Sequence, residues 1–447
     1  MFRIFIIKRS AIISLLTLFC STLTLQANSD IKQIVTSDYD NYLSELFLHF
    51  HKNPELSLQE FKTAKRMAQE LSKEGFTVTE NVGGTGVVAI MKNGDGPLVM
   101  MRADMDGLPV PEKSGLSYAS KATQKDLITG NVVPVMHACG HDVHITSLVG
   151  TARYMNAHKN DWSGTLMLLV QPAEERIIGA KMMVEDNLWE RFGLPDYALA
   201  FHVGSGLTTG TINVVDGAPF AGADTVDIIV HGIGAHGASP HSGKDPIVLA
   251  SQIVVALQTL VSRELPPRDA GVVTVGSFHS GTKHNIISDK AVLQLTVRNT
   301  NLKTRKLLLD GIKRIAVNMG RVAGLPEDKL PEVIVSEETT PPTINNSALV
   351  ARLTTVWDKE LGSKNVSTGQ GKGMGAEDFP FFTTEPAIKS VYFGVGGTPA
   401  ADFDVAASGG KAVPSHHSPL FKITPKPAVI TGTEATIYAL LELMPVK

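Results

Sequence analysis

The sequence predicts an α/β protein with a smaller α+β domain inserted into it. Apolar strands near both ends of the chain alternate with amphipathic helices, and several end in polar side chains, which is typical of an open α/β sheet. Between them, over residues 223–336, the expected order is strand, helix, strand, strand, helix, strand, which is the ferredoxin-like split unit. The chain has 447 residues, more than one core usually serves, so about two domains are expected.

Composition and charge fit a soluble globular enzyme. Hydrophobic residues make up 43% of the chain and charged residues 19%. The net charge is -3, and the basic residues form no stripe, so neither nucleic acid nor a membrane surface is an expected partner. Beyond the N-terminal segment we expect no stretch to span a membrane.

Residues 1–27 have the order of a secretory signal peptide. The apolar run 11–20 is too short for a comfortable membrane span, and polar residues then lead to Ala27, after which we expect cleavage. Three basic residues precede the run: Arg3, Lys8 and Arg9. We therefore expect an exported protein, periplasmic or secreted, with no membrane contact after cleavage. An uncleaved N-terminal anchor is the alternative. Cys20 could suggest a lipoprotein, but Phe19 before it is too bulky for that cleavage site.

The first part of the mature chain, residues 28–216, predicts helices followed by an α/β sheet. Apolar residues recur at helical spacing between residues 40 and 75, and Gly75 ends the second helix as a C-cap. A helix is expected at 142–157, and strands are expected at 87–91, 98–102, 165–170 and 197–203. Between the first two strands, Asn93-Gly94-Asp95-Gly96 is a hairpin signal.

Gly217-Ala-Pro219 marks a boundary, and the inserted domain is expected over residues 217–340. Its expected strands lie at 223–231, 271–278, 290–298 and 332–336, and its helices at 246–262 and 302–322. The chain returns to the α/β domain over residues 341–447. There we expect helices near 347–361 and 426–443, a Gly-rich turn at 371–378, a strand at 389–395, and a loop at the glycine cluster 394–397.

Carboxylates and imidazoles stand at the ends of the expected strands, where α/β sheets place their chemistry. They are Asp104, Asp106, Glu174, Glu175 and His202, joined by His417 in a late turn. Each has an ordinary structural alternative. Asp106 can cap its own turn, a pair of glutamates can be a solvated loop, and a histidine on a strand is by default a core residue.

The stretch Met136-His-Ala-Cys-Gly-His-Asp142 places a thiol, Cys139, two residues before an imidazole, His141. After the expected cleavage Cys139 is the one remaining cysteine of the chain's 2, so it has no intramolecular disulfide partner. A metal thiolate is one of the few stable fates of such a residue. A buried free cysteine beside a capping His and Asp is the alternative.

Taken together, these side chains are enough for two divalent ions with open positions. Thiolate, imidazole and carboxylate suit zinc or manganese better than calcium or magnesium. A thiolate can bridge two such ions, and water between them would be acidified toward neutral pH. One carboxylate must stay free to take its proton, which accounts for a second Glu beside a liganding one.

Several stretches that span nearly the whole mature chain carry a family resemblance: His49-Phe-His-Lys-Asn-Pro-Glu-Leu-Ser57, Met101-Arg-Ala-Asp-Met-Asp-Gly-Leu-Pro109, Met136-His-Ala-Cys-Gly-His-Asp142, Gln171-Pro-Ala-Glu-Glu175, Gly234-Ala-His-Gly-Ala-Ser-Pro-His241, Gly281-Thr-Lys-His-Asn285, Met374-Gly-Ala-Glu-Asp-Phe379 and His417-Ser-Pro419. In these the chain resembles the M20 metallopeptidases, specifically the amidohydrolase branch with hippurate hydrolases, N-acyl-amino-acid hydrolases and plant indole-acetyl-amino-acid hydrolases.

The resemblance implies a mixed-sheet metallopeptidase catalytic domain in two parts, 28–216 and 341–447, and an inserted ferredoxin-like dimerisation or lid domain. It implies Glu174 as general base and Asp104 as its supporting carboxylate. The metal ligands it implies are Cys139 (bridging), His141, Glu175, His202 and His417, with His417 and not His416 in the place before Ser-Pro. In the inserted domain it implies that His236 reaches across a homodimer to the scissile carbonyl, and that Asn285 and Arg298 hold the substrate carboxylate.

Three places depart from the family's pattern: Val143, Arg176 and Lys283-His284. They bear on substrate choice more than on chemistry. We therefore expect a two-metal enzyme, with zinc or manganese, that cleaves N-acyl-amino acids or small peptides. Dipeptidase or carboxypeptidase action on the same fold is the second possibility. An exported binding protein that has lost turnover is the third, and it is disfavoured because neither the base nor any ligand is missing.

Overall fold

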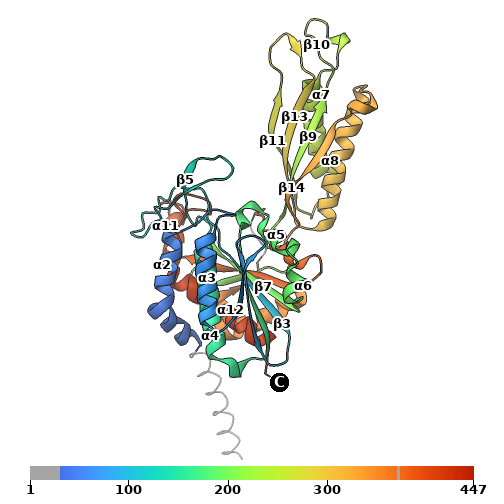
Figure 1. Ribbon diagram of the computed structural model, residues 1–447. Coiled ribbons are helices and arrows are strands. Elements are labelled where there is room, and N and C mark those ends of the chain that lie inside the picture. The colour runs from blue at the N-terminus through green and yellow to red at the C-terminus, as the bar shows by residue number, and fades with distance from the viewer. Residues whose placement is uncertain (1–30, 370–372, 447) are drawn as a thin grey trace, which may run out of the picture.

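The computed structural model describes residues 31–369 and 373–446 as a broad α/β body from which a narrow α+β unit projects (Figure 1). The predicted fold class is confirmed: a mixed sheet lies between layers of helices, and the inserted strands form a second sheet. The expected signal peptide, and Gly371 and Lys372 of the glycine-rich turn, lie outside the described residues.

The body is built on one eight-stranded sheet of order β1-β2-β6-β3-β7-β16-β8-β15. Its strands are β1 (Thr77–Val82), β2 (Gly86–Asn93), β3 (Leu98–Asp104), β6 (Gly164–Gln171), β7 (Tyr197–Thr208), β8 (Ile212–Val214), β15 (Val366–Ser367) and β16 (Lys389–Thr398). The central strands β6, β3, β7 and β16 run parallel to one another, whereas β1, β2 and β8 pair antiparallel with their neighbours toward the centre. The carboxyl ends of the central strands therefore meet at one edge.

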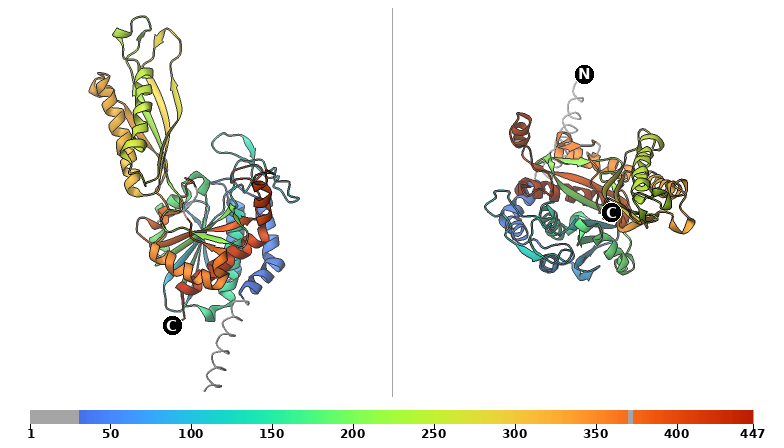
Figure 2. Two further views of the ribbon diagram at one scale, coloured as in Figure 1. Left: turned by 180° about the vertical axis from the view of Figure 1, so that it is seen from behind. Right: turned by 90° about the horizontal axis from the view of Figure 1, so that it is seen from above.

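Different helices cover the two faces of this sheet (Figure 2). Side chains alternate along a strand, so Leu166, Leu168 and Val170 of β6 enter one core while Met167 and Leu169 enter the other. The first core is closed by α2 (Ser44–Lys52), α3 (Phe61–Lys73), α4 (His141–Ala157), α9 (Ser347–Trp357) and α12 (Pro425–Leu443). The second is closed by α5 (Gly179–Glu185), α6 (Leu188–Phe192) and α10 (Pro380–Thr383).

The hairpin expected at residues 93–96 is wrong. Strand β6 lies between β2 and β3 and pairs with both, so the two strands on either side of this turn never meet. The turn packs instead on the start of β6, where a Cβ added at Gly96 would lie 2.6 Å from the Ser163 carbonyl oxygen. The hairpin of this region joins β1 to β2 through two glycines of positive φ, Gly83 and Gly84.

The loop expected at residues 394–397 is also wrong, because β16 continues to Thr398. The glycines are required there by close approach of the neighbouring chain. A Cβ added at Gly396 would lie 1.7 Å from the Thr208 carbonyl oxygen, and one at Gly394 would lie 2.9 Å from the Leu207 side chain. Glycine inside a strand marks such contacts as well as loops.

The inserted unit has the order expected of a ferredoxin-like split unit. Its elements are β9 (Gly222–His231), α7 (Pro246–Thr259), β11 (Gly271–Ser280), β13 (Lys290–Asn299), α8 (Leu302–Val322) and β14 (Glu332–Thr340). The sheet order β11-β13-β9-β14 is antiparallel throughout, and both helices pack on one face of it. A small pair, β10 (Ala235–His236) and β12 (Ile286–Ile287), lies at the end farthest from the body (Figure 1).

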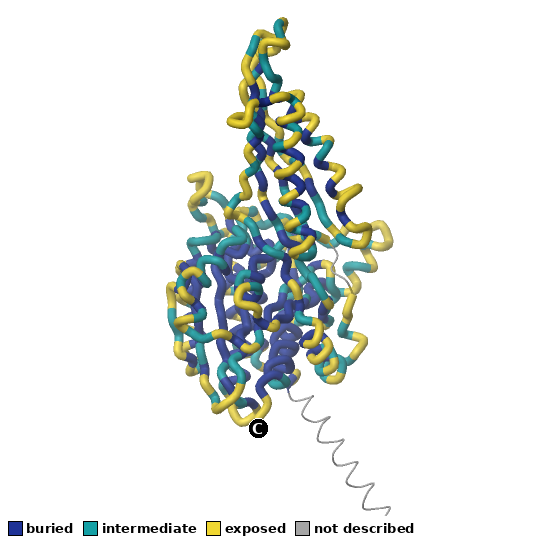
Figure 3. The backbone as a smooth tube through the Cα atoms, turned by 90° about the vertical axis from the view of Figure 1, so that its right-hand side faces the viewer, coloured by how far each residue is buried: buried dark blue, intermediate teal, exposed yellow. Residues whose placement is uncertain are grey.

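The α/β body buries more of its residues than the inserted unit does (Figure 3). The helix α4 is buried on nearly all sides, whereas α7 buries one side only. The stretch Pro246–Glu264, α7 with the π-helical turn η5 (Leu260–Glu264), is long and apolar enough to cross a membrane by length and composition. Its inner face nevertheless packs on the four-stranded sheet through Leu249, Ile253 and Leu257.

The remaining elements are short. Residues 31–38 are helical and continue through η1 (Tyr39–Leu43) into α2, and α9 continues into η7 (Asp358–Gly362). The others are the hairpin β4 (Thr123–Lys125) and β5 (Val132–Pro134), the helix α11 (Ala400–Ala407) and the 3-10 turns η2 (Lys159–Asp161), η3 (Glu174–Arg176), η4 (Pro240–Ser242), η6 (Glu327–Lys329) and η8 (Ser363–Asn365).

Candidate metal centre

The turn before α4 places a thiol and an imidazole at the carboxyl edge of the large sheet. Gly140 has φ +85° at the N-cap, and a Cβ there would lie 2.4 Å from the Val203 side chain, so glycine is required. Cys139 precedes this glycine and His141 opens the helix, and both side chains are buried. Burial and the charges of Glu175 and Glu174 raise the pKa of the Cys139 thiol well above its ordinary value, so a cation at the sulfur would be needed to hold it as a thiolate.

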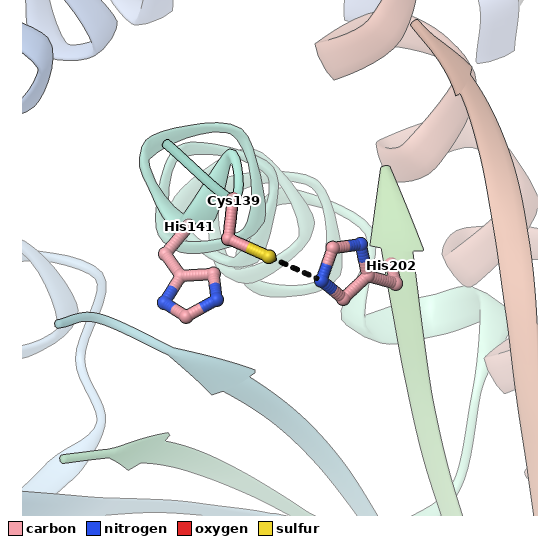
Figure 4. A group of neighbouring side chains, drawn as sticks. All are labelled: Cys139, His141 and His202. Carbon is pink, nitrogen blue, oxygen red and sulfur yellow. Dashed lines mark hydrogen bonds between the residues drawn. The ribbon is translucent and has the colours of Figure 1, made fainter. Parts of the chain in front are cut away.

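The five ligands implied by the resemblance come together in two groups of three that share Cys139. Ligand atoms of Cys139, His141 and His202 lie within 4.8 Å of one another, and so do those of Cys139, Glu175 and His417. The Cys139 Sγ is 3.3 Å from His202 Nε2, with the His141 ring beside the same sulfur (Figure 4). His417 Nε2 is 3.4 Å from Glu175 Oε2. One sulfur thus stands between two ligand sets.

Some buried polar atoms of this cluster have no hydrogen-bond partner within residues 31–369 and 373–446. They are Nε2 of His141 and Oε1 of Glu175. Buried polar atoms are nearly always bonded, and the exceptions call for an explanation such as an ion. The donor set is a thiolate, imidazoles and a carboxylate, which zinc and comparable transition metals accept. The residues therefore fit divalent cations.

The pKa shifts of the buried side chains in this cluster also indicate a site for cations. Burial, followed by the charges of Glu377 and Glu175, raises the pKa of Glu174 well above its ordinary value. Burial also raises the pKa of Glu175, to about 8. Burial would lower the pKa of His141, but the carboxylates around it, first Asp104, outweigh this and raise it to about 10. This excess of buried negative charge is what divalent cations would neutralise.

Two buried carboxylates hold the turn that carries Glu174 and Glu175. Asp106 accepts the backbone N–H groups of Glu174 (3.2 Å) and Glu175 (3.1 Å). Glu60 accepts the N–H of Ala173, a residue with φ +48°, at 2.9 Å. Asp106 also lies 3.3 Å from His141 Nδ1. Asp106 thus caps a turn on a different strand from its own, next to a ligand and the candidate base.

Asp104 is held in a separate buried network. Its Oδ2 accepts a bond from Arg102 (2.7 Å) and its Oδ1 lies 2.5 Å from His144 Nδ1. Arg102 also pairs with Glu377 at 2.7 Å. Burial would raise the pKa of Asp104, but Arg102 and the neighbouring histidines outweigh it and keep this pKa well below its ordinary value. Asp104 stays charged, 3.7 Å from His141 Nε2.

Comparison with known proteins identifies the family and the fold. A family model described as peptidase family M20/M25/M40 matches residues 100–407. The chain belongs to this family. Like it, the chain is a metal-binding hydrolase that acts on carbon–nitrogen bonds.

Three curated relatives are similar over most of the chain. A hippurate hydrolase of Campylobacter jejuni is 39% identical over 333 residues, 74% of this chain and 82% of that protein. A thermostable carboxypeptidase 2 of Saccharolobus solfataricus is 35% identical over 82% of this chain and 88% of its own. The IAA-amino acid hydrolase ILR1-like 4 of Arabidopsis thaliana is 35% identical over 91% and 88%.

A crystal structure also supports membership of the M20 family. The YXEP protein of Bacillus subtilis, a dinuclear metal binding peptidase from the M20 family, superimposes with a TM-score of 0.74 at 25% identity. The match covers 91% of this chain and 99% of that one. The resemblance predicted from the motifs is therefore confirmed.

The three implied residues of the inserted unit in this M20 chain are not brought together. His236 is exposed on β10, and Asn285 lies beside it, where its carbonyl accepts the Gly237 N–H at 2.8 Å. Arg298 lies at the other end of β13, half-buried, where burial lowers its pKa and Asp224 opposes that shift. From residue 290 to 298 the strand alone spans roughly 26 Å. Asn285 and Arg298 of one chain cannot hold one carboxylate.

The departures from the M20 pattern lie in different surroundings. Val143 is fully buried in α4. Arg176 pairs with Glu338 of β14 at 3.3 Å, which links the turn after the glutamates to the inserted unit. Lys283 and His284 are exposed near the distal pair β10 and β12.

Sequence reasoning missed four residues that hold the site: Glu60, Arg102, His144 and His416. Two weak signals existed. His144 follows His141 by three positions on the same helix, so both rings face one side. His416 is adjacent to His417.

Proposed function

We propose that the chain hydrolyses the amide bond of N-acyl-amino acids or small peptides with two divalent cations, zinc or manganese. Cys139 would bridge them, and His141, Glu175, His202 and His417 would complete the two ligand sets. The observation that carries this proposal is the pair of three-residue groups that share the Cys139 sulfur, with Glu174 adjacent to Glu175.

Glu174 is the general base in this proposal. Cations bound at the cluster would lower the pKa of a coordinated water toward neutrality. Glu174 would take the proton of that water and pass it to the departing amine. Asp106 would fix the base by binding its backbone N–H, and Asp104 would support the site through His144.

A homodimer formed through the inserted unit (residues 217–340) is part of the proposal. One side of α7 is apolar and exposed, with Val255 at 71% and Val248 at 54%. Apolar patches of this kind mark protein contacts. His236 and Asn285 lie together at the distal end, so they would enter the partner's site together. His236 would then donate to the developing oxyanion, and Asn285 would share the substrate carboxylate with Arg298 of the partner subunit.

Dipeptidase or carboxypeptidase action is the second candidate. It is supported by the carboxypeptidase relative, which is 35% identical. Both candidates place a free carboxylate near the scissile amide, so Arg298 serves either. A binding protein without turnover is disfavoured because Glu174 is retained beside an intact ligand set.

The proposal also includes the protein's localisation: residues 1–27 would be cleaved as a signal peptide and the chain would be exported. N-terminal sequencing of protein from the producing cell tests this, with Asn28 expected as the first residue. Retention of Met1 in a membrane fraction would indicate an uncleaved anchor instead.

A substrate panel tests the activity. Purified protein loaded with zinc or manganese would be assayed on N-acyl-amino acids, dipeptides and longer peptides. We expect metal-dependent cleavage, fastest for N-acyl-amino acids. Faster cleavage of dipeptides would favour the second candidate, and absence of turnover on all of them in a protein that holds two metals would contradict both.

A further inference from the structure

The backbone N–H and carbonyl of Val203, on β7 directly after His202, are bonded to three imidazoles. Its N–H donates to Nε2 of His144 at 2.9 Å. Its carbonyl oxygen lies 2.8 Å from Nδ1 of His202 and 2.9 Å from Nε2 of His416. These two backbone groups are free for side chains because the ladder between β3 and β7 ends at the pair Arg102 and Ala200, while β7 continues to Thr208.

These bonds determine where each ring carries its proton. An amide N–H can only donate, so His144 Nε2 must accept and its proton sits on Nδ1, facing Asp104 Oδ1 at 2.5 Å. A carbonyl oxygen can only accept, so His202 carries its proton on Nδ1 and His416 on Nε2. The remaining nitrogen of His202, Nε2, has a free lone pair and faces the Cys139 sulfur at 3.3 Å.

His416 also anchors the segment that carries His417. Residues 411–415, which lead to it, contain no regular helix or strand. The segment is attached at two adjacent points: His416 donates to Val203 and the His417 N–H donates to the Ala138 carbonyl at 2.9 Å. His417 has φ +64°, a conformation that a residue with a Cβ keeps only when its surroundings hold it.

We propose that His416 and His144 are positioning residues that, through the backbone carbonyl and N–H of Val203, hold His202 in the tautomer that binds metal by Nε2, and that His416 also sets the position of His417. The inference rests on the proposed function, since it needs His202 and His417 to be ligands. Two adjacent histidines then have different tasks, because His417 offers its nitrogen to a cation while His416 has already committed its Nε2 proton to Val203. Such bonds to the second nitrogen of a ligand imidazole fix its orientation and are worth roughly 10- to 100-fold in metal affinity.

The test compares two substitutions in the full chain. His416→Gln retains an N–H donor that can reach the Val203 carbonyl, whereas His416→Leu has similar bulk and none. Zinc affinity would be measured by competition with a chelator, and the absorption spectrum of the cobalt-loaded protein would report on the ligands. We expect His416→Leu to lower the affinity for the more weakly bound of the two zinc ions by about 10- to 100-fold and to alter the cobalt spectrum. We expect His416→Gln to stay close to wild type in both measurements.

Equal zinc affinity and an unchanged cobalt spectrum in His416→Leu would overturn the proposal. Equal losses in both variants would overturn it too, because the donated bond would not be the cause. If His416→Leu does not fold, the tautomer is read in the zinc-loaded wild-type protein by NMR of 15N-labelled histidine, with the His202 signals assigned from the His202→Ala variant. Protonated Nδ1 supports the inference, and protonated Nε2 contradicts it. Failure of wild type to bind zinc at all would count against the proposed function instead.

Discussion

The two regions that carry the candidate functional residues are built in opposite ways. The metal centre draws its side chains from several elements of the body and buries most of them, although His417 is exposed. Buried side chains also hold its backbone, as Asp106 and Glu60 do for the Glu174–Glu175 turn. The distal end of the inserted unit is exposed, and the ring of His236 there accepts a hydrogen bond from the nearby Ala238 N–H at 3.0 Å. All candidate metal ligands of the first region belong to one chain. In the second region, His236 and Asn285 would contact a substrate only if another subunit approached them.

This difference teaches that buried and exposed polar groups require different explanations. The buried cluster is costly without cations, so its residues are explained by what they bind. An exposed histidine on a short strand costs nothing, so His236 is explained only by a surface that it can approach. Variants in the two regions should therefore behave differently, and those differences can be ordered by size.

The largest effect is expected at the base. Glu174→Gln keeps the shape of the turn and the backbone N–H that Asp106 binds, but it cannot take a proton. We expect kcat to fall by about 10²-fold or more, with metal content and substrate affinity retained. Steady-state kinetics with metal analysis on the same sample measures this. A wild-type kcat in the variant would remove Glu174 from the mechanism.

The next effect concerns the carboxylate of the substrate. Arg298 is half-buried and has no ion pair among the described residues, so a substrate carboxylate would satisfy it. We expect an N-acyl-amino acid to be cleaved at least about 10²-fold better in kcat/KM than its C-terminal amide. Arg298→Ala should reduce this ratio by slowing only the acid. Equal rates on acid and amide with the wild-type enzyme would indicate a broader amidase.

A smaller but more specific effect should follow from mixing chains. Chains with His236→Ala and chains with Glu174→Gln are each expected to be poorly active. If His236 acts in the partner's site, a mixed dimer contains one site with both wild-type groups, so part of the activity returns. Lack of rescue after subunit exchange has been demonstrated would show that His236 acts in its own subunit or not at all.

The smallest effect at neutral pH concerns His51, which is bonded to Asp142, the residue after the candidate ligand His141. His51 lies 2.7 Å from Asp142 and 3.2 Å from Glu112. Burial would lower its pKa, but bonds to Asp142 and Glu112 outweigh burial and raise it to about 9 from 6.5. A raised pKa stabilises the fold fully below pH 6.5, and the contribution disappears as pH rises through about 9.

We therefore expect wild type to lose up to about 3 kcal/mol more unfolding free energy between pH 6 and pH 10 than His51→Gln does. Urea unfolding of both proteins, in the same metal state, measures the difference. The variant is the control for other groups that titrate over this range. Parallel pH curves for the two proteins would show that His51 is not charged in the folded state.

The candidate ligands could be named from sequence because each stands in a short motif that the family resemblance identifies, on a strand for His202, after a strand for Glu175, and in or next to a turn for Cys139, His141 and His417. The groups that hold them could not, because their partners are backbone atoms far away in the chain. Asp106 was expected to cap its own turn, and instead it binds N–H groups 68 and 69 residues away. His144 and His416 bind the backbone N–H and carbonyl of the same residue, Val203, which no local pattern reveals.

The fold errors have a similar origin. Gly94 and Gly96 indicate a chain reversal correctly, but whether the two flanking strands pair depends on β6, which arrives later in the sequence. The glycines of β16 look like a loop because the nearby Thr208 carbonyl, which excludes a side chain at Gly396, belongs to β7. In both cases the decisive contact lies on another strand.

The central claim is that two cations share the Cys139 sulfur, and metal content tests it most directly. Wild-type protein and Cys139→Ser would be loaded with zinc, dialysed and measured for zinc per chain, with circular dichroism to confirm folding. We predict two zinc ions per chain in wild type, and loss of bound metal together with activity in a folded Cys139→Ser variant. A variant that keeps two zinc ions per chain and a near-normal rate would contradict the account.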